Sequence, residues 1–371
     1  MNRKINRIVK IENCLKHIGL SIIFISILIF DAFGQVKYIA AENLTFVGKP
    51  KKTENSYQRI DRDSTVGMPE SVRKLAMNSA GIAVIFETNS PLIRAKWDLA
   101  EFKYMANMTP IGHSGLDLYC YNDGKWQFVN TGKPVKDSIH QNQLLVHNMD
   151  HSMKQFMLYL PLYNTLTSLE IGVDPGSSIT ASIPKNIDMK KRLVVYGSSI
   201  VQGASASRPG MAYPAILQRK LGIDVINLGF SGSAKMEMPL AEYLATVPAD
   251  CFVLDCIPNP SPTEIKERGF AFIDYLRRKR PHTPIILVET VIRENGHFDQ
   301  HVGTRVSEQN KAIQEVYAQL TKKGITGIHY ITADELMGTD HEATIDGVHL
   351  TDLGFDRISN KILQVVRKIQ N

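Results

Sequence analysis

The feature that most constrains the fold is a regular alternation of short apolar runs with amphipathic stretches across the C-terminal half of the chain. The apolar runs predict short buried strands at Arg192–Tyr196, Asp224–Asn227, Phe252–Leu254, Ile285–Glu289 and Gly327–Ile331. Apolar residues recur at helical spacing in Tyr213–Leu221, Thr263–Arg280, Ser307–Lys323 and Leu353–Ile369. Strands that alternate with helices predict a parallel sheet with helices on both faces.

The N-terminal half has a different pattern, in which apolar and polar residues alternate with a period of two. The alternation is clearest in Ile93–Leu99, and Asn122-Asp123-Gly124-Lys125 is a strong hairpin signal. No long amphipathic helix is evident, so we predict an antiparallel β-sandwich over residues 35–185, followed by an α/β domain over residues 186–371. The other strands predicted in this half are Gly81–Phe86, Lys125–Val129, Phe156–Leu160 and Leu169–Val173.

The first 34 residues have the pattern of a secretory signal. Five Lys and Arg residues precede the apolar run Ile18–Phe30, whose 13 residues are too few for a membrane span, which needs about 20. Ala32 and Gly34 supply small residues at a cleavage site. We therefore predict a signal peptide over residues 1–34, cleavage after Gly34, and a secreted or periplasmic protein without a further membrane span. An uncleaved N-terminal anchor is the alternative.

Composition argues against several kinds of partner and ligand. The 371 residues carry a net charge of +6, of which residues 1–34 hold +3, and no basic run dominates, so nucleic-acid binding is not predicted. Besides Cys14, the chain has an odd set of three cysteines, which we expect in the core: Cys120, Cys251 and Cys256. The histidines lack metal-ligand spacing, so no metal or cofactor is predicted; they include His113, His147, His151, His297, His301 and His341.

A serine at the end of the first C-terminal strand is the first candidate for chemistry. Gly197, Ser198 and Ser199 follow this strand directly, and an open α/β sheet binds ligands at the carboxyl ends of its strands. The segment is not the G-x-S-x-G elbow, because Val201 replaces its second glycine, and it lacks the Gly-Lys-Ser/Thr of a phosphate-binding loop. Ser199 is the candidate nucleophile, although a Gly-Ser-Ser turn alone is more often only a turn.

The segment Asp346-Gly347-Val348-His349 can supply an acid and a base. A spacing of three residues lets the Asp346 carboxylate accept a hydrogen bond from Nδ1 of His349, which leaves Nε2 free to take the Ser199 proton. Taken alone, the same pair also fits a surface contact.

Two further turns offer donors for an oxyanion. Gly232 ends the segment Asn227–Gly232 after the second strand, and Asn259 follows the third strand between two prolines. The backbone N–H groups of Ser199 and Gly232, together with the side-chain amide of Asn259, would form an oxyanion hole. Each segment alone also fits an ordinary turn.

As a set, these four segments resemble the SGNH/GDSL hydrolase superfamily, whose conserved blocks are named for Ser, Gly, Asn and His. The resemblance covers residues 190–371. It implies a flavodoxin-like α/β/α sandwich and ester hydrolysis through an acyl-enzyme, with Ser199, His349 and Asp346 as the triad. Two positions depart from the family pattern: Ser198 stands where Asp is common, and Asp255–Asn259 replaces the frequent Gly-x-Asn-Asp.

The N-terminal half also contains a family motif. Gly115–Tyr119 matches the Gly-x-Asp-Leu-Tyr motif of a subgroup with an N-terminal β-domain, which implies a jelly-roll-like sandwich. Similar pairs of domains occur in carbohydrate esterases that remove acetyl groups from polysaccharides. Trp97 and Trp126 can stack on sugar rings, but their alternating strands favour core packing.

The resemblance thus implies a serine esterase for small acyl groups, with an O-acetylated carbohydrate or polysaccharide as the expected substrate. A lipid or thioester hydrolase and a glycan-binding protein with an inactive SGNH domain are the alternatives. The sugar, the regioselectivity and the oligomeric state are not specified by the sequence.

Overall fold

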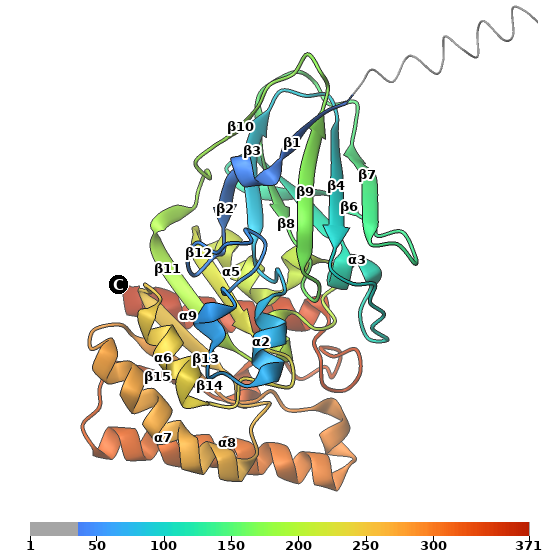
Figure 1. Ribbon diagram of the computed structural model, residues 1–371. Helices are drawn as coiled ribbons and strands as arrows, with labels where there is room; N and C mark the ends of the chain where they lie inside the picture. Colours follow the sequence, from blue (N-terminus) through green and yellow to red (C-terminus); the bar gives the residue numbers. More distant parts are fainter. Residues whose placement is uncertain (1–35, 371) are drawn as a thin grey trace, which may run out of the picture.

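The computed structural model describes residues 36–370, so the predicted signal peptide lies outside the described residues. Figure 1 shows two stacked parts, with antiparallel strands from the N-terminal half at one end and a helix-covered sheet from the C-terminal half at the other. This arrangement confirms the predicted fold class.

The C-terminal half is built around a parallel sheet with strand order β12-β11-β13-β14-β15. Because β11 lies between β12 and β13, the turns that follow these three strands meet at one edge of the sheet. The strands are β11 (Asp188–Gly197), β12 (Ile223–Gly229), β13 (Cys251–Asp255), β14 (Ile285–Val288) and β15 (Ile328–Ile331).

Helices cover both faces of this sheet. Leu193 and Val195 of β11 share a core with α5 (Tyr213–Leu221) and α9 (Asp352–Gln370). Val194 and Tyr196 point the other way, into the core formed with α6 (Met238–Thr246), α7 (Pro262–Lys279) and α8 (Gln300–Lys322). Burial on both faces explains why the strands appear in the sequence as uninterrupted apolar runs.

Two helices in this half differ from the prediction. Helix α8 begins at Gln300 rather than at Ser307, because the Asp299 side chain caps it by accepting from the backbone N–H groups of His301 and Val302. Its apolar periodicity begins only later, which hid the first turns. Helix α6 was not predicted at all, since its nine residues give little periodicity.

The N-terminal half folds into two antiparallel sheets that share one core. Trp97 and Ile171 from one sheet pack with Leu118 and Phe156 from the other. One sheet has the order β1 (Lys37–Ala40), β9 (Leu166–Val173), β4 (Ile93–Leu99), β7 (His140–Val146). The other has the order β10 (Ile179–Ala181), β3 (Ala83–Thr88), β8 (Lys154–Tyr159), β5 (Leu116–Asn122), β6 (Lys125–Gly132), with β2 (Thr45–Val47) beside β3.

The predicted hairpin forms β5 and β6. Asn122 pairs with Lys125, so Asp123 and Gly124 make a two-residue turn, and their φ angles of 47° and 78° suit it. Strand β7 was not predicted, because this edge strand exposes mainly polar residues.

The N-terminal half also contributes helical turns that the alternation did not predict. Val72 and Ala76 of α2 (Glu70–Ala76) are buried in the core on the second face of the parallel sheet. A second short helix of this half is α3 (Pro110–Ser114); in the C-terminal half, the short helix α4 (Ser199–Gln202) directly follows β11. The two halves therefore share buried contacts.

The Gly-x-Asp-Leu-Tyr motif joins the two halves. Asp117, which is fully buried, accepts hydrogen bonds from Arg208 Nη1 and Gly210 N, both at 2.8 Å. The Tyr119 hydroxyl accepts a hydrogen bond from the same guanidinium at 2.5 Å. Burial raises the pKa of the Asp117 carboxyl, although Arg208 opposes this shift. The motif thus fixes the segment between α4 and α5.

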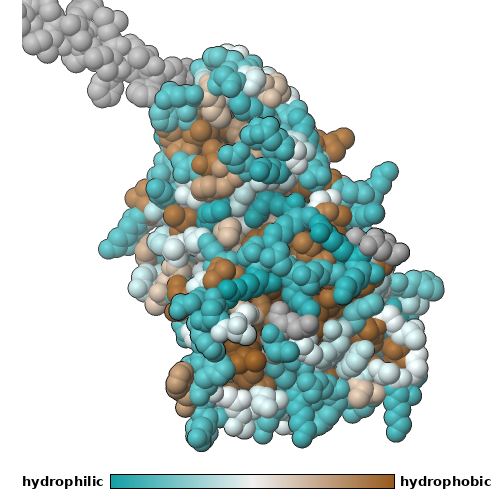
Figure 2. Space-filling model, turned by 180° about the vertical axis from the view of Figure 1, so that it is seen from behind, coloured by the Kyte–Doolittle hydropathy of each residue, from teal (hydrophilic) through white to brown (hydrophobic). Residues whose placement is uncertain are grey.

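The face shown in Figure 2 is largely polar, and the core contains most of the cysteine and tryptophan side chains. Hydrophobic side chains on the face shown in Figure 2 form small groups among polar ones. No helix within residues 36–370 is long and apolar enough to cross a membrane. Cys251 and Cys256 are buried and free, and Trp97 and Trp126 are buried, as core packing predicts. Cys120 was also expected in the core but is only half-buried, because it lies where β5 becomes more exposed toward its hairpin turn.

Candidate active site

The turn after β11 presents Ser199 at the edge of the parallel sheet. Ser198 caps the following turn, with its side chain accepting from the backbone N–H of Ile200 at 3.3 Å. A side chain at Gly197 would collide with the neighbouring strand, because its Cβ would lie 2.1 Å from the Asp255 carbonyl oxygen. Glycine at this position lets β11 and β13 approach closely and sets the direction of the turn.

Ser199, His349 and Asp346 form a continuous chain of hydrogen bonds. Nε2 of His349 lies 3.0 Å from Oγ of Ser199, and its Nδ1 lies 2.7 Å from Oδ2 of Asp346. The structure thus brings together three residues that the sequence predicts as a triad. Nε2 is within the distance at which a general base takes a proton from a hydroxyl.

The Asp346 carboxylate is surrounded by donors. Its Oδ1 accepts from the backbone N–H groups of Val348 and His349, at 3.0 and 2.7 Å. Burial raises the pKa of Asp346, but these bonds and the His349 side chain outweigh it, and the net pKa lies below the ordinary value. Asp346 is therefore an ionised partner that can orient the imidazole.

Asn107 is a further donor that the sequence did not indicate. Its Nδ2 lies 3.3 Å from Oδ2 of Asp346 and 3.4 Å from Nδ1 of His349. Asn107 stands just before α3, in the N-terminal half, far from the triad along the chain. The N-terminal half therefore contacts the Asp346–His349 pair directly.

A pocket of about 300 Å³ opens beside the Ser199 hydroxyl. Gly232 stands at its wall with a φ of +65°, a conformation that side chains rarely adopt. The buried side chain of Gln202 holds this loop by accepting from the backbone N–H of Ser231 at 3.0 Å. The lining residues are Ser199, Ile200, Ser231, Gly232, Pro258, Asn259, Thr290, Val291, Arg293, Val348 and His349.

Asn259 lines the pocket, but its amide is already engaged. Its Nδ2 donates to the carbonyl oxygen of Phe230 at 3.2 Å and to that of Ser233. Both of its amide hydrogens thus have acceptors in this structure. Asn259 lies where the sequence predicts it, but its amide must turn before it can donate to an oxyanion.

A buried arginine supports the loop after β12 from below. Arg59 is fully buried, and its Nη1 donates to the carbonyl oxygens of Asn227 at 3.1 Å and Gly229 at 2.7 Å. Burial lowers the pKa of Arg59 to about 9. The remaining hydrogen bonds of the guanidinium go to the carbonyl oxygens of Leu75 and Asn78.

A second buried charge-bearing group lies at the end of β13. Asp255 accepts a hydrogen bond from the Tyr213 hydroxyl at 2.9 Å, and burial raises its pKa to about 7, although this bond opposes the shift. Its backbone carbonyl accepts from the N–H of Ser198 at 3.1 Å. Asp255 thus lies directly beneath the turn that carries Ser199.

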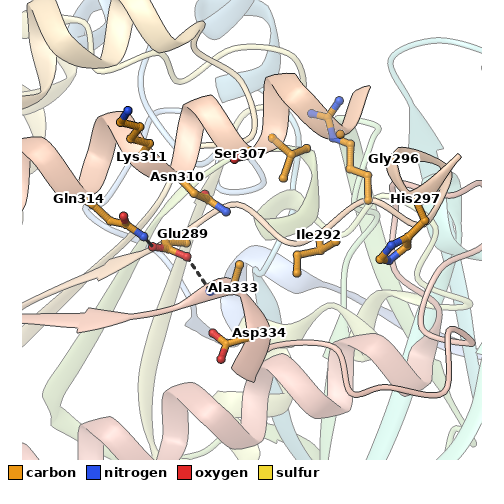
Figure 3. Close-up of a pocket in the computed structure, with 13 residues that line it drawn as sticks. Glu289, Ile292, Gly296, His297, Ser307, Asn310, Lys311, Gln314, Ala333 and Asp334 are labelled. Carbon is orange, nitrogen blue, oxygen red and sulfur yellow. Dashed lines mark hydrogen bonds between the residues drawn. The ribbon is translucent and has the colours of Figure 1, made fainter. Parts of the chain in front are cut away.

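A larger cavity of about 710 Å³ adjoins the pocket, and Arg293 lines both. Figure 3 shows Ser307, Asn310 and Lys311 of α8 on one wall of this cavity. Glu289 is held on the wall by Gln314 Nε2 and by the backbone N–H of Ala333, at 2.6 and 2.8 Å. The Nη2 of Arg293 donates to the Pro258 carbonyl oxygen at 3.2 Å. Arg293 therefore lies between the pocket beside Ser199 and this larger cavity.

Comparisons with known proteins identify the family of each half of the chain. Residues 190–367 match the model of the GDSL-like lipase/acylhydrolase family, and residues 36–179 match that of the GxDLY N-terminus of SGNH-hydrolase-type esterases. A crystal structure described as a GDSL-like lipase from Bacteroides ovatus is 47% identical, with a TM-score of 0.87. The match covers 91% of this chain and 98% of that one. No curated protein sequence matches the chain.

More distant structures share the fold. A salicylyl-acyltransferase from a tetracycline biosynthetic pathway is 18% identical, with a TM-score of 0.71, and covers 90% of this chain and 98% of its own length. A family two carbohydrate esterase from Cellvibrio japonicus is 11% identical, with a TM-score of 0.59 and the same coverage.

The 47% identity extends over both halves, and each half also matches its own family model. The chain therefore belongs to the GDSL-like lipase/acylhydrolase family, in the group of SGNH-type esterases that carry a GxDLY N-terminal region.

Proposed function

We propose that the protein is a serine esterase in which Ser199 attacks the ester carbonyl. The observation that carries this proposal is the chain of contacts from Ser199 Oγ through His349 to Asp346, at 3.0 and 2.7 Å. His349 takes the hydroxyl proton at Nε2 as the tetrahedral intermediate forms, then gives it to the leaving alcohol. Water, activated by the same imidazole, then hydrolyses the acyl-Ser199 ester and releases the acid.

The oxyanion is stabilised by backbone donors at the wall of the pocket. Ser199 is the first residue of α4, so its N–H has no acceptor within the helix, and the Gly232 N–H belongs to the neighbouring turn. Asn259 contributes its amide after turning away from the Phe230 and Ser233 carbonyl oxygens. Each such donor is worth about 10²–10³ in rate.

We propose a small acyl group, and specifically an O-acetyl group on a carbohydrate or polysaccharide, as the substrate. The pocket of about 300 Å³ beside Ser199 suits a short acyl chain, and the cavity beyond Arg293 offers room for the alcohol part. Carbohydrate esterases among the fold relatives and the predicted signal peptide support this choice. Lipid and thioester hydrolysis are the alternatives of the same chemistry.

The test is hydrolysis of p-nitrophenyl acetate by the wild type, by Ser199→Ala and by Ser198→Ala. We expect Ser199→Ala to lose about 10⁴- to 10⁶-fold in kcat, as other serine hydrolases do without their nucleophile. Ser198→Ala removes a helix cap that contributes about 1 kcal/mol to the free energy of unfolding. This variant should be less stable but should keep most of its activity. Acetylated glycans are then screened for release of acetate.

Three outcomes would contradict the proposal. Equal activity in the wild type and Ser199→Ala would exclude Ser199 as the nucleophile. A much higher rate on long-chain esters or thioesters would favour the alternative hydrolases. Glycan binding that persists in Ser199→Ala, with no turnover by the wild type, would favour a binding protein.

A further inference from the structure

Three potential metal ligands meet where two loops touch at the edge of the site. A short 3-10 helix, η4 (Glu294–His297), follows β14, and its spacing of three residues puts its first and last side chains on one face. His341 approaches from the loop that leads to the catalytic Asp346. The three side chains are 19%, 45% and 64% exposed in the order Glu294, His297, His341, so an ion from solvent can reach them.

The donor atoms of these residues are close together. Oε2 of Glu294 lies 2.9 Å from Nδ1 of His341 and 3.9 Å from Nε2 of His297. The two imidazole rings are 5.2 Å apart and perpendicular. One donor atom from each residue fits within 4.8 Å of the others.

We propose that Glu294, His297 and His341 bind one borderline transition-metal ion, with Zn²⁺ as the probe. Two imidazoles and one carboxylate form a donor set that such ions prefer. Ligand atoms about 2.1 Å from a tetrahedral Zn²⁺ are about 3.4 Å from one another. The separations of 2.9 and 3.9 Å bracket this value, so small side-chain rotations suffice.

The arrangement is poorly explained by hydrogen bonding alone. The bond between His341 and Glu294 is a normal one, but 3.9 Å is too long for a hydrogen bond from His297 to the same oxygen. His341 also has a φ of +62°, which is uncommon for a residue with a side chain. A metal ion bound by all three side chains would account for the position of both imidazoles beside this carboxylate.

The site is connected to the catalytic loop by the backbone. The N–H of Glu294 donates to the Gly347 carbonyl oxygen at 2.9 Å, and Gly347 lies between Asp346 and His349. Arg293, the residue before Glu294, lines the catalytic pocket. An ion here would therefore link the loop after β14 to the loop that carries the acid and the base, and would stabilise both without taking part in the chemistry.

The sequence predicted no metal site, and the proposal departs from that prediction for a physical reason. His297 and Glu294 are neighbours along the chain, but His341 follows only after α8 and β15. The fold brings His341 close to the other two residues, and no short spacing in the sequence indicates this.

The test is a calorimetric titration of the EDTA-treated, dialysed protein with ZnCl₂, in the Ser199→Ala background as well as in the wild type. We expect one saturable site of micromolar affinity or better in both proteins, and a higher Tm with Zn²⁺. Because this readout needs no turnover, it remains valid if the proposed esterase activity fails.

Variants identify the ligands. His297→Ala and His341→Ala should each weaken Zn²⁺ binding by about a hundredfold or more, since loss of even a supporting hydrogen bond at a metal site costs about ten- to a hundredfold. His301→Ala is the matched control, because His301 is exposed at the start of α8 and is not part of the cluster. Glu294→Gln preserves the shape if an alanine variant does not fold.

Two results would overturn the proposal. One is the absence of saturable binding at Zn²⁺ concentrations up to the solubility limit. The other is equal affinity in the wild type, His297→Ala, His341→Ala and Glu294→Gln, which would assign the binding to other surface histidines.

Discussion

The ionised carboxylate of Asp346 depends on donors from both halves of the chain. Val348 and His349 supply backbone N–H groups, His349 supplies its Nδ1, and Asn107 supplies a side-chain amide from the N-terminal half. Because each donor favours the charged form, each one helps to keep the carboxylate available to the imidazole.

Asn107→Ala should lower kcat for p-nitrophenyl acetate by about tenfold, the value of one hydrogen bond to a charged group, and leave KM unchanged. Asn107 touches Asp346 and His349 and is absent from the lining of the pocket, so the loss belongs to catalysis rather than binding. Steady-state kinetics separates the two.

The control is Asn142→Ala on strand β7, which removes an amide oxygen that accepts a hydrogen bond from Arg94 of the neighbouring strand β4. An unchanged kcat in Asn107→Ala, or an equal loss in the control, would show that Asn107 does not position the triad.

At the scale of single residues, the sequence predicted site residues that carry a local signal, such as a position after a strand or a partner a few residues away. Ser199 and His349 follow from the turn after β11 and the Asp-x-x-His spacing. Asn107 and Arg59 carry no local signal, because their partners lie far along the chain. The orientation of the Asn259 amide could not be predicted either, since it depends on carbonyl oxygens of another turn.

At the scale of elements, the buried clamp is the ion pair between Asp117 of β5 and Arg208, which precedes α5. It links the N-terminal half to the C-terminal half. The Asp117 side chain is 0% exposed and that of Arg208 is 20% exposed. An ion pair in such surroundings is costly to break, because one charge remains buried without its partner.

Asp117→Ala should therefore lower the free energy of unfolding by about 3–5 kcal/mol. Glu70→Ala is the comparison: it breaks a pair with Lys74 whose side chains are 76% and 75% exposed, and we expect no measurable change. Urea unfolding followed by circular dichroism measures both. Similar midpoints for the two variants would mean that the buried clamp contributes no more than a surface pair.

Periodicity predicted the elements whose faces differ most in polarity. The bounds of β4 and α5 agree with the predicted residues, because β4 alternates strictly between buried and half-buried positions and α5 has a continuous buried face. Strand β7 was missed because an edge strand can keep polar residues on its exposed face, and α2 because seven residues span only about two turns.

For the whole molecule, the buried carboxyl of Asp255 couples stability to pH. Its folded-state pKa of about 7 lies above the value of about 3.9 for an unfolded chain. Between these values the folded protein holds a proton that the unfolded chain has released, so the contribution of Asp255 to stability falls as the pH rises. Below both values the contribution is constant.

Asp255→Asn removes this titration and keeps an acceptor for the Tyr213 hydroxyl. The variant should gain stability over the wild type as the pH increases from 4 to 7, reaching about 4 kcal/mol at most above pH 7. Unfolding midpoints at a series of pH values measure the difference. Asp123→Asn, in the exposed β5–β6 turn, is the control, and a pH-independent difference for Asp255→Asn would contradict the assignment.

The contacts of Arg59 and Asn107 bear on how such a protein can change over evolution. Both residues precede the segment that matches the hydrolase family model, yet one supports the turn next to Gly232 and the other donates to Asp346. A gene fusion that exchanged the β-sandwich for an unrelated glycan-binding module would remove both at once. We therefore expect recombination at the junction between the halves to yield inactive chimeras unless both residues are carried across.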